Sequence, residues 1–438
     1  MNLSQFSTLR VAATDLNGQM RGKRVPAAYA AKLDKGAVRM PLSALNLDIW
    51  GADIENSPLV FETGDADGIL FPTERGPVPM PWLDTPSALV PMTMCNEDGT
   101  PFLGDPRQAL TSVLERYTAR GWSVMAATEM EFSLVDDTGK KLRPPHDPRS
   151  QRRLFGPDIL SIDELDAFDD FFTELYNGCV AMGLPAQTII NEAGLGQFEV
   201  TLTHQAALRA ADDAVLFKML VRGIARRHGM AATFMAKPYS DDAGNGMHVH
   251  FSVLDQDGKN VFDNGGPEGT DTLMQAVAGC VQAMPASTLI FAPHGPSYAR
   301  LVPGAHAPTG ACWAYENRTA AIRIPGGPHL ARRIEHRVAG GDINPYLMLA
   351  CVLGAAIEGV DEGLTPPDPI SGNAYEHDLP QLAPDWETAI SRFEADPFIA
   401  RCLPKMLIDN LVMTKRQELK KLAEMPSKDH WKLYLERV

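Results

Sequence analysis

The stretch KPYSDDAGNGMHVHFS, residues 237–252, places glycines and two adjacent acids directly before a pair of histidines. Gly244 and Gly246 allow the backbone to come close to a bulky group. His248 and His250 are two residues apart, so their side chains project from one face if this segment is a strand. The stretch therefore predicts a ligand-binding strand, although it does not identify the ligand.

The same spacing recurs in other predicted strands. ATEMEFSL carries Glu129 and Glu131, and ARRIEHRV carries Arg333, Glu335 and Arg337. Taken alone, each pattern is typical of a solvated strand face. Because side chains two apart share a face, their joint occurrence predicts that several strands line one cavity.

The segment NEAGLGQFEV adds Glu192 and Glu199 around a glycine-rich turn. A site rich in carboxylate oxygen suits Mg²⁺ or Mn²⁺ better than zinc. Gathered carboxylates repel one another and take up protons unless cations offset them. The chain supplies arginines for this purpose, or for surface ion pairs, at positions 300, 318, 323, 333 and 337. Arginine grips phosphate and carboxylate through paired donors.

Composition restricts the classes of partner and compartment. The net charge of -15 over 438 residues argues against nucleic acid or an anionic membrane as the main partner. The cysteines form no CxxC pair, which suits a reducing compartment. The start MNLSQFSTLRVAATD has no apolar segment typical of a signal peptide, and the apolar run Tyr346–Ile357 is too short to span a bilayer. We expect a soluble cytoplasmic protein.

The residue pattern of the sequence changes near residue 105, which predicts domains at 1–105 and 106–438. The first part consists of short pieces punctuated by proline and glycine, typical of small strands and turns. A helical pattern then runs from Asp105 to Gly121. Further helices are expected at 163–182, 210–228, 271–284, 344–358 and in pieces within 386–425, and strands at 122–135, 197–203, 247–254, 320–324 and 333–338. This alternation predicts an α+β protein with a mostly antiparallel sheet.

Neither a GxxxxGK[ST] loop nor a strand-GxGxxG-helix unit occurs, which excludes a Walker-type NTPase or a Rossmann dehydrogenase. Instead, TEMEFS, NEAGLGQFE, GNGMHVHFS, RLVPG, NRTAAIRIP, RRIEHR and NPYL follow one another in the order found in glutamine synthetases, which the chain resembles over nearly its full length. The resemblance implies a small N-terminal β-grasp-like domain and a large catalytic domain with a curved antiparallel sheet surrounded by helices. It also implies a homo-oligomer, a dodecamer with its sites between subunits.

The resemblance further implies a carbon-nitrogen ligase that uses ATP with Mg²⁺ or Mn²⁺. One metal ion would be held by Glu131, Glu192 and Glu199, and the other by Glu129, His248 and Glu335. Glutamate would meet Arg300, Arg337 and the backbone of Gly244. The nucleotide phosphates would meet His250, Arg318, Arg323 and Arg333, with Ser252 near the base. The γ-carboxylate first accepts the terminal phosphoryl group of ATP, and an amine then displaces phosphate.

Some positions depart from the family pattern. RLVPGAHAP has Ala305 and His306 where the family has an aromatic residue and a glutamate, Ala243 replaces an asparagine, and the Asp-Gly-Ser-Ser segment is missing. Losing two acids weakens a site for ammonium. The chain thus resembles the γ-glutamylpolyamine synthetase branch, and we expect a polyamine acceptor such as putrescine. The alternatives are a small monoamine such as ethanolamine or methylamine, or ordinary glutamine synthesis from ammonium.

A protonated amine, with a pKa of about 10 if it behaves like lysine, must lose a proton before it attacks. His306 is the catalytic candidate for the base, although it also fits a role in lining the pocket. Asp48, Asp53 and Glu55 suit the distal ammonium of a diamine better. Tyr375, which lies roughly where some relatives are nucleotidylated, is expected to be an inert surface residue.

Overall fold

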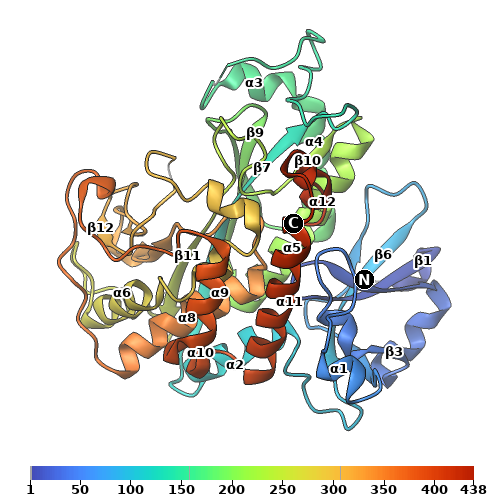
Figure 1. The fold of residues 1–438 in the computed structure, drawn as a ribbon, viewed down its shortest axis with the longest axis horizontal. Coiled ribbons are helices and arrows are strands. Elements are labelled where there is room, and N and C mark those ends of the chain that lie inside the picture. Colours follow the sequence, from blue (N-terminus) through green and yellow to red (C-terminus); the bar gives the residue numbers. More distant parts are fainter. Residues whose placement is uncertain (1, 157, 306) are drawn as a thin grey trace.

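The computed structural model describes residues 2–156, 158–305 and 307–438 and contains two β-sheets with associated helices (Figure 1). The smaller, N-terminal sheet has the strand order β2-β1-β6-β4-β3, with β5 paired to β6. Its neighbours are antiparallel except for β1 and β6, which are parallel. Its strands are β1 (Thr8–Thr14), β2 (Met20–Pro26), β3 (Val38–Pro41), β4 (Asp67–Pro72), β5 (Val78–Pro79) and β6 (Ser87–Cys95).

The larger sheet has the order β12-β13-β14-β11-β7-β9-β8, with β10 paired to one end of β7. Its pairs are antiparallel except for β12 and β13. The strands are β7 (Ser123–Val135), β8 (Ala186–Asn191), β9 (Gln197–Ala206), β10 (Ala231–Thr233), β11 (Met247–Leu254), β12 (Trp313–Tyr315), β13 (Ile322–Ile324) and β14 (Ile334–His336). The predicted α+β class is confirmed.

Helices cover the larger sheet, and Figure 1 shows α2, α8, α9, α10 and α11 gathered below it. The helices are α1 (Pro58–Phe61), α2 (Pro106–Thr118), α3 (Ile162–Ala167), α4 (Asp169–Met182), α5 (Ala207–Arg227), α6 (Asp271–Ala283), α7 (Thr288–Phe291), α8 (Pro345–Asp361), α9 (Trp386–Ala395), α10 (Pro397–Cys402), α11 (Lys405–Ala423) and α12 (His430–Tyr434). Helix α2 begins as predicted, because the Asp105 side chain accepts a hydrogen bond from the amide of Arg107 and Pro106 takes the first helical position.

The apolar run noted in the sequence forms the buried helix α8, which packs against α6. The two helices touch at glycines: a Cβ atom on Gly279 would lie 2.0 Å from the carbonyl oxygen of Ala355. Among the helices of the described residues, none has both the length and the apolar character needed to cross a membrane.

The single helix expected at 163–182 is wrong, because the chain turns at Phe168 between α3 and α4. Phe168 has φ -102° and ψ 21° and is 1% exposed. Its ring packs against that of Phe198 on β9, with the ring centroids 5.5 Å apart. An uninterrupted helix would have to give up this conformation, so the packing of the aromatic core favours the turn.

Helix α11 holds the N-terminal segment against the rest of the chain through buried polar contacts. The buried carboxylate of Glu418 accepts hydrogen bonds from the Asn17 side chain (2.9 Å) and the Ile49 amide (2.7 Å). It also pairs with buried Lys415 at 2.9 Å, and Lys415 donates to the side-chain oxygen of Asn17 at 2.6 Å. The contacts of Asn17 and Ile49 with α11 join residues 369 to 401 positions apart in the sequence.

Glu418→Ala should lower the free energy of unfolding by about 3–5 kcal/mol, because it leaves the Lys415 ammonium buried without its charge partner. Urea unfolding of the purified protein measures the effect. Arg416→Ala on the same helix is the control, since Arg416 pairs with Glu394 in solvent and its loss should cost no more than about 1 kcal/mol. An equal decrease in the free energy of unfolding of the two variants would contradict a stabilising role for the buried contacts of Glu418.

Candidate functional site

Two adjacent strands of the larger sheet present their polar residues on one face. On β11, Met247, Val249 and Phe251 are buried in the core, while His248 and His250 alternate with them. On β7, the core positions Met130 and Phe132 likewise alternate with the glutamates. The period of two in the sequence thus separates an apolar face from a charged one.

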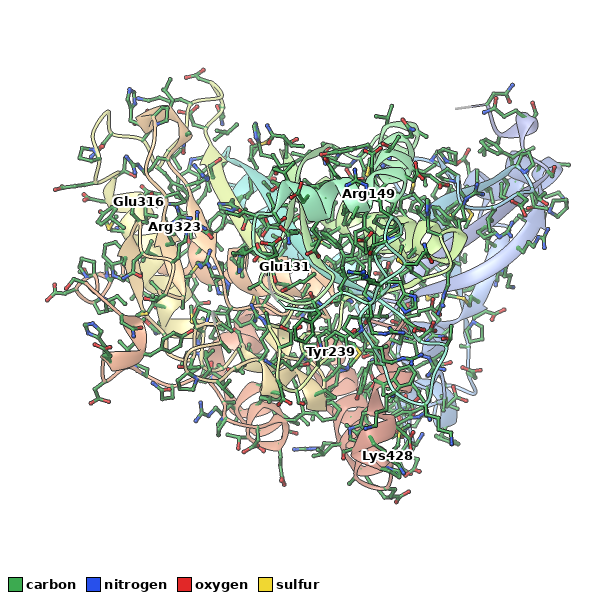
Figure 2. The ribbon with its side chains drawn as sticks, turned by 90° about the horizontal axis from the view of Figure 1, so that it is seen from above. Glu131, Arg149, Tyr239, Glu316, Arg323 and Lys428 are labelled. Carbon is green, nitrogen blue, oxygen red and sulfur yellow. The ribbon has the colours of Figure 1, made fainter. Side chains whose placement is uncertain are left out.

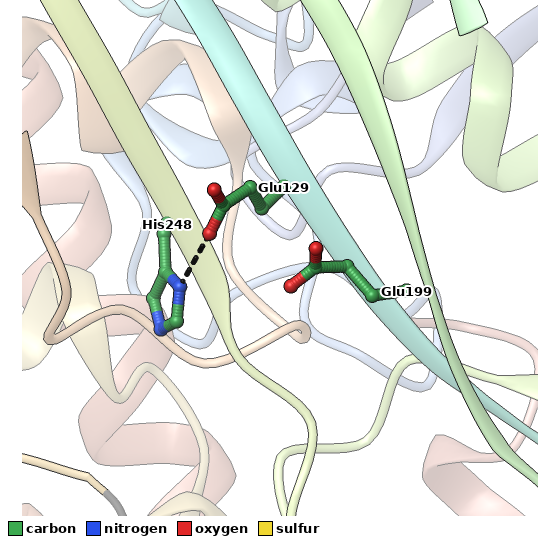
Figure 3. Close-up of side chains that lie close together, drawn as sticks. All are labelled: Glu129, Glu199 and His248. Carbon is green, nitrogen blue, oxygen red and sulfur yellow. Dashed lines mark hydrogen bonds and ion pairs between the residues drawn. The ribbon is translucent and has the colours of Figure 1, made fainter. Parts of the chain in front are cut away.

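Strand register brings the charged residues into one row. His248 lies opposite Glu129 across the pairing of β11 with β7, and Glu131 lies opposite Glu199 across β7 and β9. Figure 3 shows Glu129, Glu199 and His248 projecting from these three strands toward one another. On the other side of β11, His250 lies opposite Glu335 on β14. The sequence-predicted carboxylates and imidazoles therefore meet across neighbouring strands.

The carboxylate of Glu129 is held between the two histidines. One of its oxygens lies 2.9 Å from Nδ1 of His248, and the other lies 2.8 Å from Nε2 of His250. Burial favours the neutral form of Glu129, but the hydrogen bonds and charge attraction of the two histidines outweigh it and hold the pKa well below its usual range. Glu129 is therefore an anion with a fixed orientation.

Glu335 is fully buried and pairs with two arginines. One oxygen accepts from Arg323 at 2.6 Å, and the other pairs with Arg337. Burial raises the pKa of Glu335, yet the charges of Arg337 and the histidines lower it overall. Arg333 lies next in this row, with its Nε 3.3 Å from Nδ1 of His250. This side of the site is cationic.

The opposite side of the row is anionic. Burial, followed by the charges of Glu129, Glu131 and Glu192, raises the pKa of Glu199 to about 9. Burial together with the charges of Glu131 and Glu129 raises the pKa of Glu192 to about 7, and the charge of exposed Arg318 opposes this rise. Carboxylates packed together in this way lack enough positive charge around them, so a divalent cation fits the site.

Two groups of side chains bring ligand atoms within 4.8 Å of one another. They are Glu129 with Glu199 and His248, and Glu129 with His250 and Glu335. Mostly oxygen donors with one imidazole suit Mg²⁺ or Mn²⁺. The assignment implied by the family resemblance, with Glu131, Glu192 and Glu199 on one ion and Glu129, His248 and Glu335 on the other, stays a prediction.

Arg300 and the loop around Gly244 lie beside the anionic side. Arg300 is 4% exposed and donates to the carbonyl oxygen of Val338 at 2.7 Å. A Cβ atom on Gly246 would lie 2.6 Å from an Arg300 nitrogen, so a larger residue at this position would displace the guanidinium. The amide of Gly246 donates to Glu131 at 2.6 Å, which ties the loop directly to the acidic row.

Gln197 is a site residue that the sequence analysis missed. Its amide nitrogen donates to Glu131 at 3.1 Å and to the carbonyl oxygen of Gly244 at 3.0 Å. The signal was present, because Gln197 and Glu199 are two apart on β9 and share a face. The clue available in the sequence was therefore a polar residue two positions from a predicted ligand, on the same face of the strand.

A cavity of about 700 Å³ adjoins the row, and its lining extends from Arg333 on the cationic side to Thr201 and His204 on β9. Glu129, His250, Ser252 and Arg333 contribute to its lining. Arg323 lies between Glu335 and the exposed Glu316, and Figure 2 shows Arg323 and Glu316 to one side of Glu131. The volume of the cavity falls within the range of small-molecule sites, about 300–1,000 Å³.

Asp48, expected to face a distal ammonium, has other partners in this chain. Its fully buried carboxylate accepts from Lys421 at 2.6 Å and from Gln417 at 2.8 Å, both on α11. It also accepts the amides of Trp50 and Ala52. Asp53 and Glu55 are exposed, and their role stays a prediction. His306 lies outside the described residues.

The crowding of carboxylates predicts that stability falls as pH rises when divalent ions are removed. The folded-state pKa values of Glu199 and Glu192, about 9 and about 7, exceed the ordinary value of 4.5, so the folded state binds more protons between pH 5 and 9 and loses stability as they leave. In EDTA at pH 8, Glu199→Gln should therefore raise Tm, because it should increase the free energy of unfolding by about 1–3 kcal/mol.

At pH 5 the wild-type protein and Glu199→Gln both carry an uncharged side chain at position 199, so the difference in Tm between them should shrink. Thermal unfolding followed by circular dichroism measures both conditions. Glu62→Gln, at an exposed carboxyl on the N-terminal part of the chain, is the control and should leave Tm nearly unchanged. An equal Tm difference at pH 5 and pH 8 would contradict charge crowding as the cause.

The family described as "Glutamine synthetase, catalytic domain" matches residues 103–434. The gamma-glutamylputrescine synthetase of Escherichia coli (strain K12) is 38% identical over 379 residues, covering 84% of this chain and 79% of that protein. The gamma-glutamylethanolamide synthetase of Streptomyces coelicolor is 31% identical over 381 residues, covering 85% of this chain and 80% of that protein.

A solved structure described as "GmaS/ADP complex-Conformation 1" has the same fold, with a TM-score of 0.86 at 27% identity. The alignment covers 100% of this chain and 99% of that one. Enzymes of this family use ATP and divalent metal ions and join glutamate to an amine. The chain therefore belongs to the glutamine synthetase family and is an ATP-dependent ligase acting on glutamate.

Proposed function

We propose that this protein joins the γ-carboxylate of glutamate to a polyamine such as putrescine, through a γ-glutamyl phosphate. The observation that supports this choice is in the sequence, where His306 replaces the family's glutamate, Ala305 replaces its aromatic residue, and the Asp-Gly-Ser-Ser segment is missing. A site with fewer fixed negative charges holds ammonium less well and leaves room for a carbon chain. The similarity to a gamma-glutamylputrescine synthetase points the same way.

Glutamate would lie between the two sides of the charged row. In this proposal the buried Arg300 receives its α-carboxylate, since a guanidinium pairs with a carboxylate through two parallel donors. Arg337, oriented by its ion pair with Glu335, would lie near the γ-carboxylate. Two fixed arginines of this kind position the reacting oxygen without further reorganisation.

ATP would occupy the cavity lined by His250, Ser252 and Arg333, with its phosphates toward the charged row. Arg323 and Arg318 would contribute positive charge as the phosphoryl group moves to glutamate. Divalent ions held by the six predicted ligands, Glu129, Glu131, Glu192, Glu199, His248 and Glu335, would neutralise charge on the phosphates. The side chains themselves supply orientation, because Glu129 and Glu335 have fixed partners.

The acceptor amine arrives as an ammonium, so a base must remove a proton before it attacks. We assign this role to His306. In a homo-oligomer with sites between subunits, which we also propose, the exposed Asp53 and Glu55 would suit the distal ammonium of a diamine bound to a neighbouring copy. Attack then forms the amide bond and releases phosphate.

A panel of amines tests the acceptor. With glutamate, ATP and Mg²⁺ present, kcat/KM measured by phosphate release should be at least about tenfold higher for putrescine than for ammonium, a difference of about 1.4 kcal/mol. Spermidine, ethanolamine and methylamine complete the panel, and mass spectrometry identifies the amide. If ammonium or ethanolamine gives the highest kcat/KM, the polyamine assignment is wrong while the ligase assignment stands.

Glu129→Gln tests the metal assignment. Because Glu129 orients both histidines and belongs to both groups of ligand atoms, its replacement should weaken Mn²⁺ binding by about 10–100-fold. Titration calorimetry or electron paramagnetic resonance of bound Mn²⁺ measures this without turnover. Glu97→Gln, at an exposed carboxyl paired with Arg39 on the surface, is the matched control. Unchanged Mn²⁺ affinity in Glu129→Gln would remove Glu129 from the metal site.

A further inference from the structure

Arg300 follows directly on the short 3₁₀ helix Gly295–Ala299. Its amide donates to the carbonyl oxygen of Ser297 at 3.1 Å, which continues the turn of that helix. Its side chain is 4% exposed and donates to the carbonyl oxygen of Val338 at 2.7 Å. The position of the guanidinium therefore depends on two supports, the 3₁₀ helix and the segment that begins at Val338.

Asp342 connects these two supports. It belongs to the segment 338–343 and is 3% exposed. Its Oδ2 accepts a hydrogen bond from the Ser297 hydroxyl at 2.6 Å. The Ser297 hydroxyl oxygen also accepts the amide of His294 at 3.2 Å, at the start of the 3₁₀ helix. The carboxyl group of Asp342 thus ties the 3₁₀ helix before Arg300 to the segment whose carbonyl oxygen holds the guanidinium.

The segment 338–343 also borders the backbone loop around Gly244, which is the other group predicted to meet glutamate. Gly340 forms a β-bridge with Gly246 of that loop. A Cβ atom on Gly340 would lie 2.6 Å from Oδ1 of Asp342, so a larger residue there would displace the carboxyl group. Asp342 therefore lies where the supports of the guanidinium and of the loop meet.

The charges around Asp342 come from α5 and from Arg300 itself. Burial raises the pKa of Asp342, and the charges of Lys218 and Arg300 are among the effects that oppose this rise. Lys218 on α5 is 5% exposed and donates to the carbonyl oxygen of Ile343 at 3.0 Å. Burial lowers the pKa of Arg300, and the charges of Glu131 and Asp342 oppose that change. Asp342 thus also provides negative charge near a buried guanidinium.

We propose that Asp342 is a positioning residue for glutamate, which fixes the Arg300 guanidinium by joining the 3₁₀ helix Gly295–Ala299 to the segment 338–343. The inference rests on the proposed function, because it requires Arg300 to receive the α-carboxylate. Asp342 is buried, so it acts through Arg300 and not by touching the substrate. A fixed guanidinium forms both of its hydrogen bonds to a carboxylate without further reorganisation. Without the link, part of the binding energy is lost in ordering Arg300.

Ser297→Ala removes the hydrogen bond to Asp342 and leaves every charge in place. We expect KM for glutamate to rise about fivefold, as for the loss of one hydrogen bond. Changes in KM for ATP and in kcat should stay below about twofold, because neither residue lines the nucleotide cavity and the α-carboxylate is remote from the reacting γ-carboxylate. Phosphate release at saturating Mg²⁺ and hydroxylamine, a small acceptor for acyl phosphates, measures these constants whichever natural amine is correct.

Asp342→Asn is the second variant. It keeps the size of the side chain, but it weakens the acceptor and removes negative charge near Arg300, so it should also raise KM for glutamate. Ser43→Ala is the matched control, since the Ser43 hydroxyl likewise donates to an aspartate, Asp65, at 2.6 Å, but in the N-terminal part of the chain. It should leave KM for glutamate unchanged. An unchanged KM for glutamate in either test variant overturns the proposal, as do equal rises in KM for glutamate and for ATP.

Arg300→Lys separates this inference from the proposed function. Lysine keeps the charge and loses the paired donors, so KM for glutamate should rise at least about tenfold. Because Asp342 acts through Arg300, adding Ser297→Ala to Arg300→Lys should raise this KM by less than about twofold more. Multiplication of the two single effects overturns the positioning role alone. An unchanged KM in Arg300→Lys shows instead that Arg300 does not receive glutamate, which contradicts that part of the proposed function and this inference with it.

Discussion

The site depends on the carboxylate of Glu129, which is held between His248 and His250. Each of its oxygens has its own imidazole partner, so the carboxylate keeps its charge despite burial. The arrangement requires β7 and β11 to pair in one register, because a slip by a single residue would turn every polar side chain to the other face. The hydrophobic residues that alternate with the histidines enforce that register.

Around this centre, charge changes sign across the sheet. Toward β14 and β13, the pairs of Glu335 with Arg323 and Arg337 leave more positive than negative charge. Toward β9, Glu131 and Glu199 face each other across the strands. Transfer of a phosphoryl group between two anions needs positive charge on both flanks. Arginines supply it on one flank, and the crowded carboxylates on the other call for metal ions.

Much of this site follows from the sequence, because strand geometry converts a spacing of two into a shared face. Glu129 and Glu131, the two histidines, and Glu335 were all identifiable from that spacing. The order of strands was not, since β14 and β9 reach β11 and β7 from distant parts of the chain. The interruption at Phe168 also escaped prediction, because the reason for it is an aromatic contact with β9 and local propensity does not report it.

The acidic residues of the N-terminal segment show why residue type alone does not assign a role. Asp48 and Asp53 are equally acidic and five positions apart. Asp48 is buried and paired with Lys421 and Gln417, so moving it toward a substrate would break the contact between α11 and the N-terminal segment. Asp53 is exposed and has no such constraint on its charge. A carboxylate can bind a cationic substrate when its charge is not already paired within the folded chain. In the N-terminal segment, the contacts with α11 decide which acids remain available.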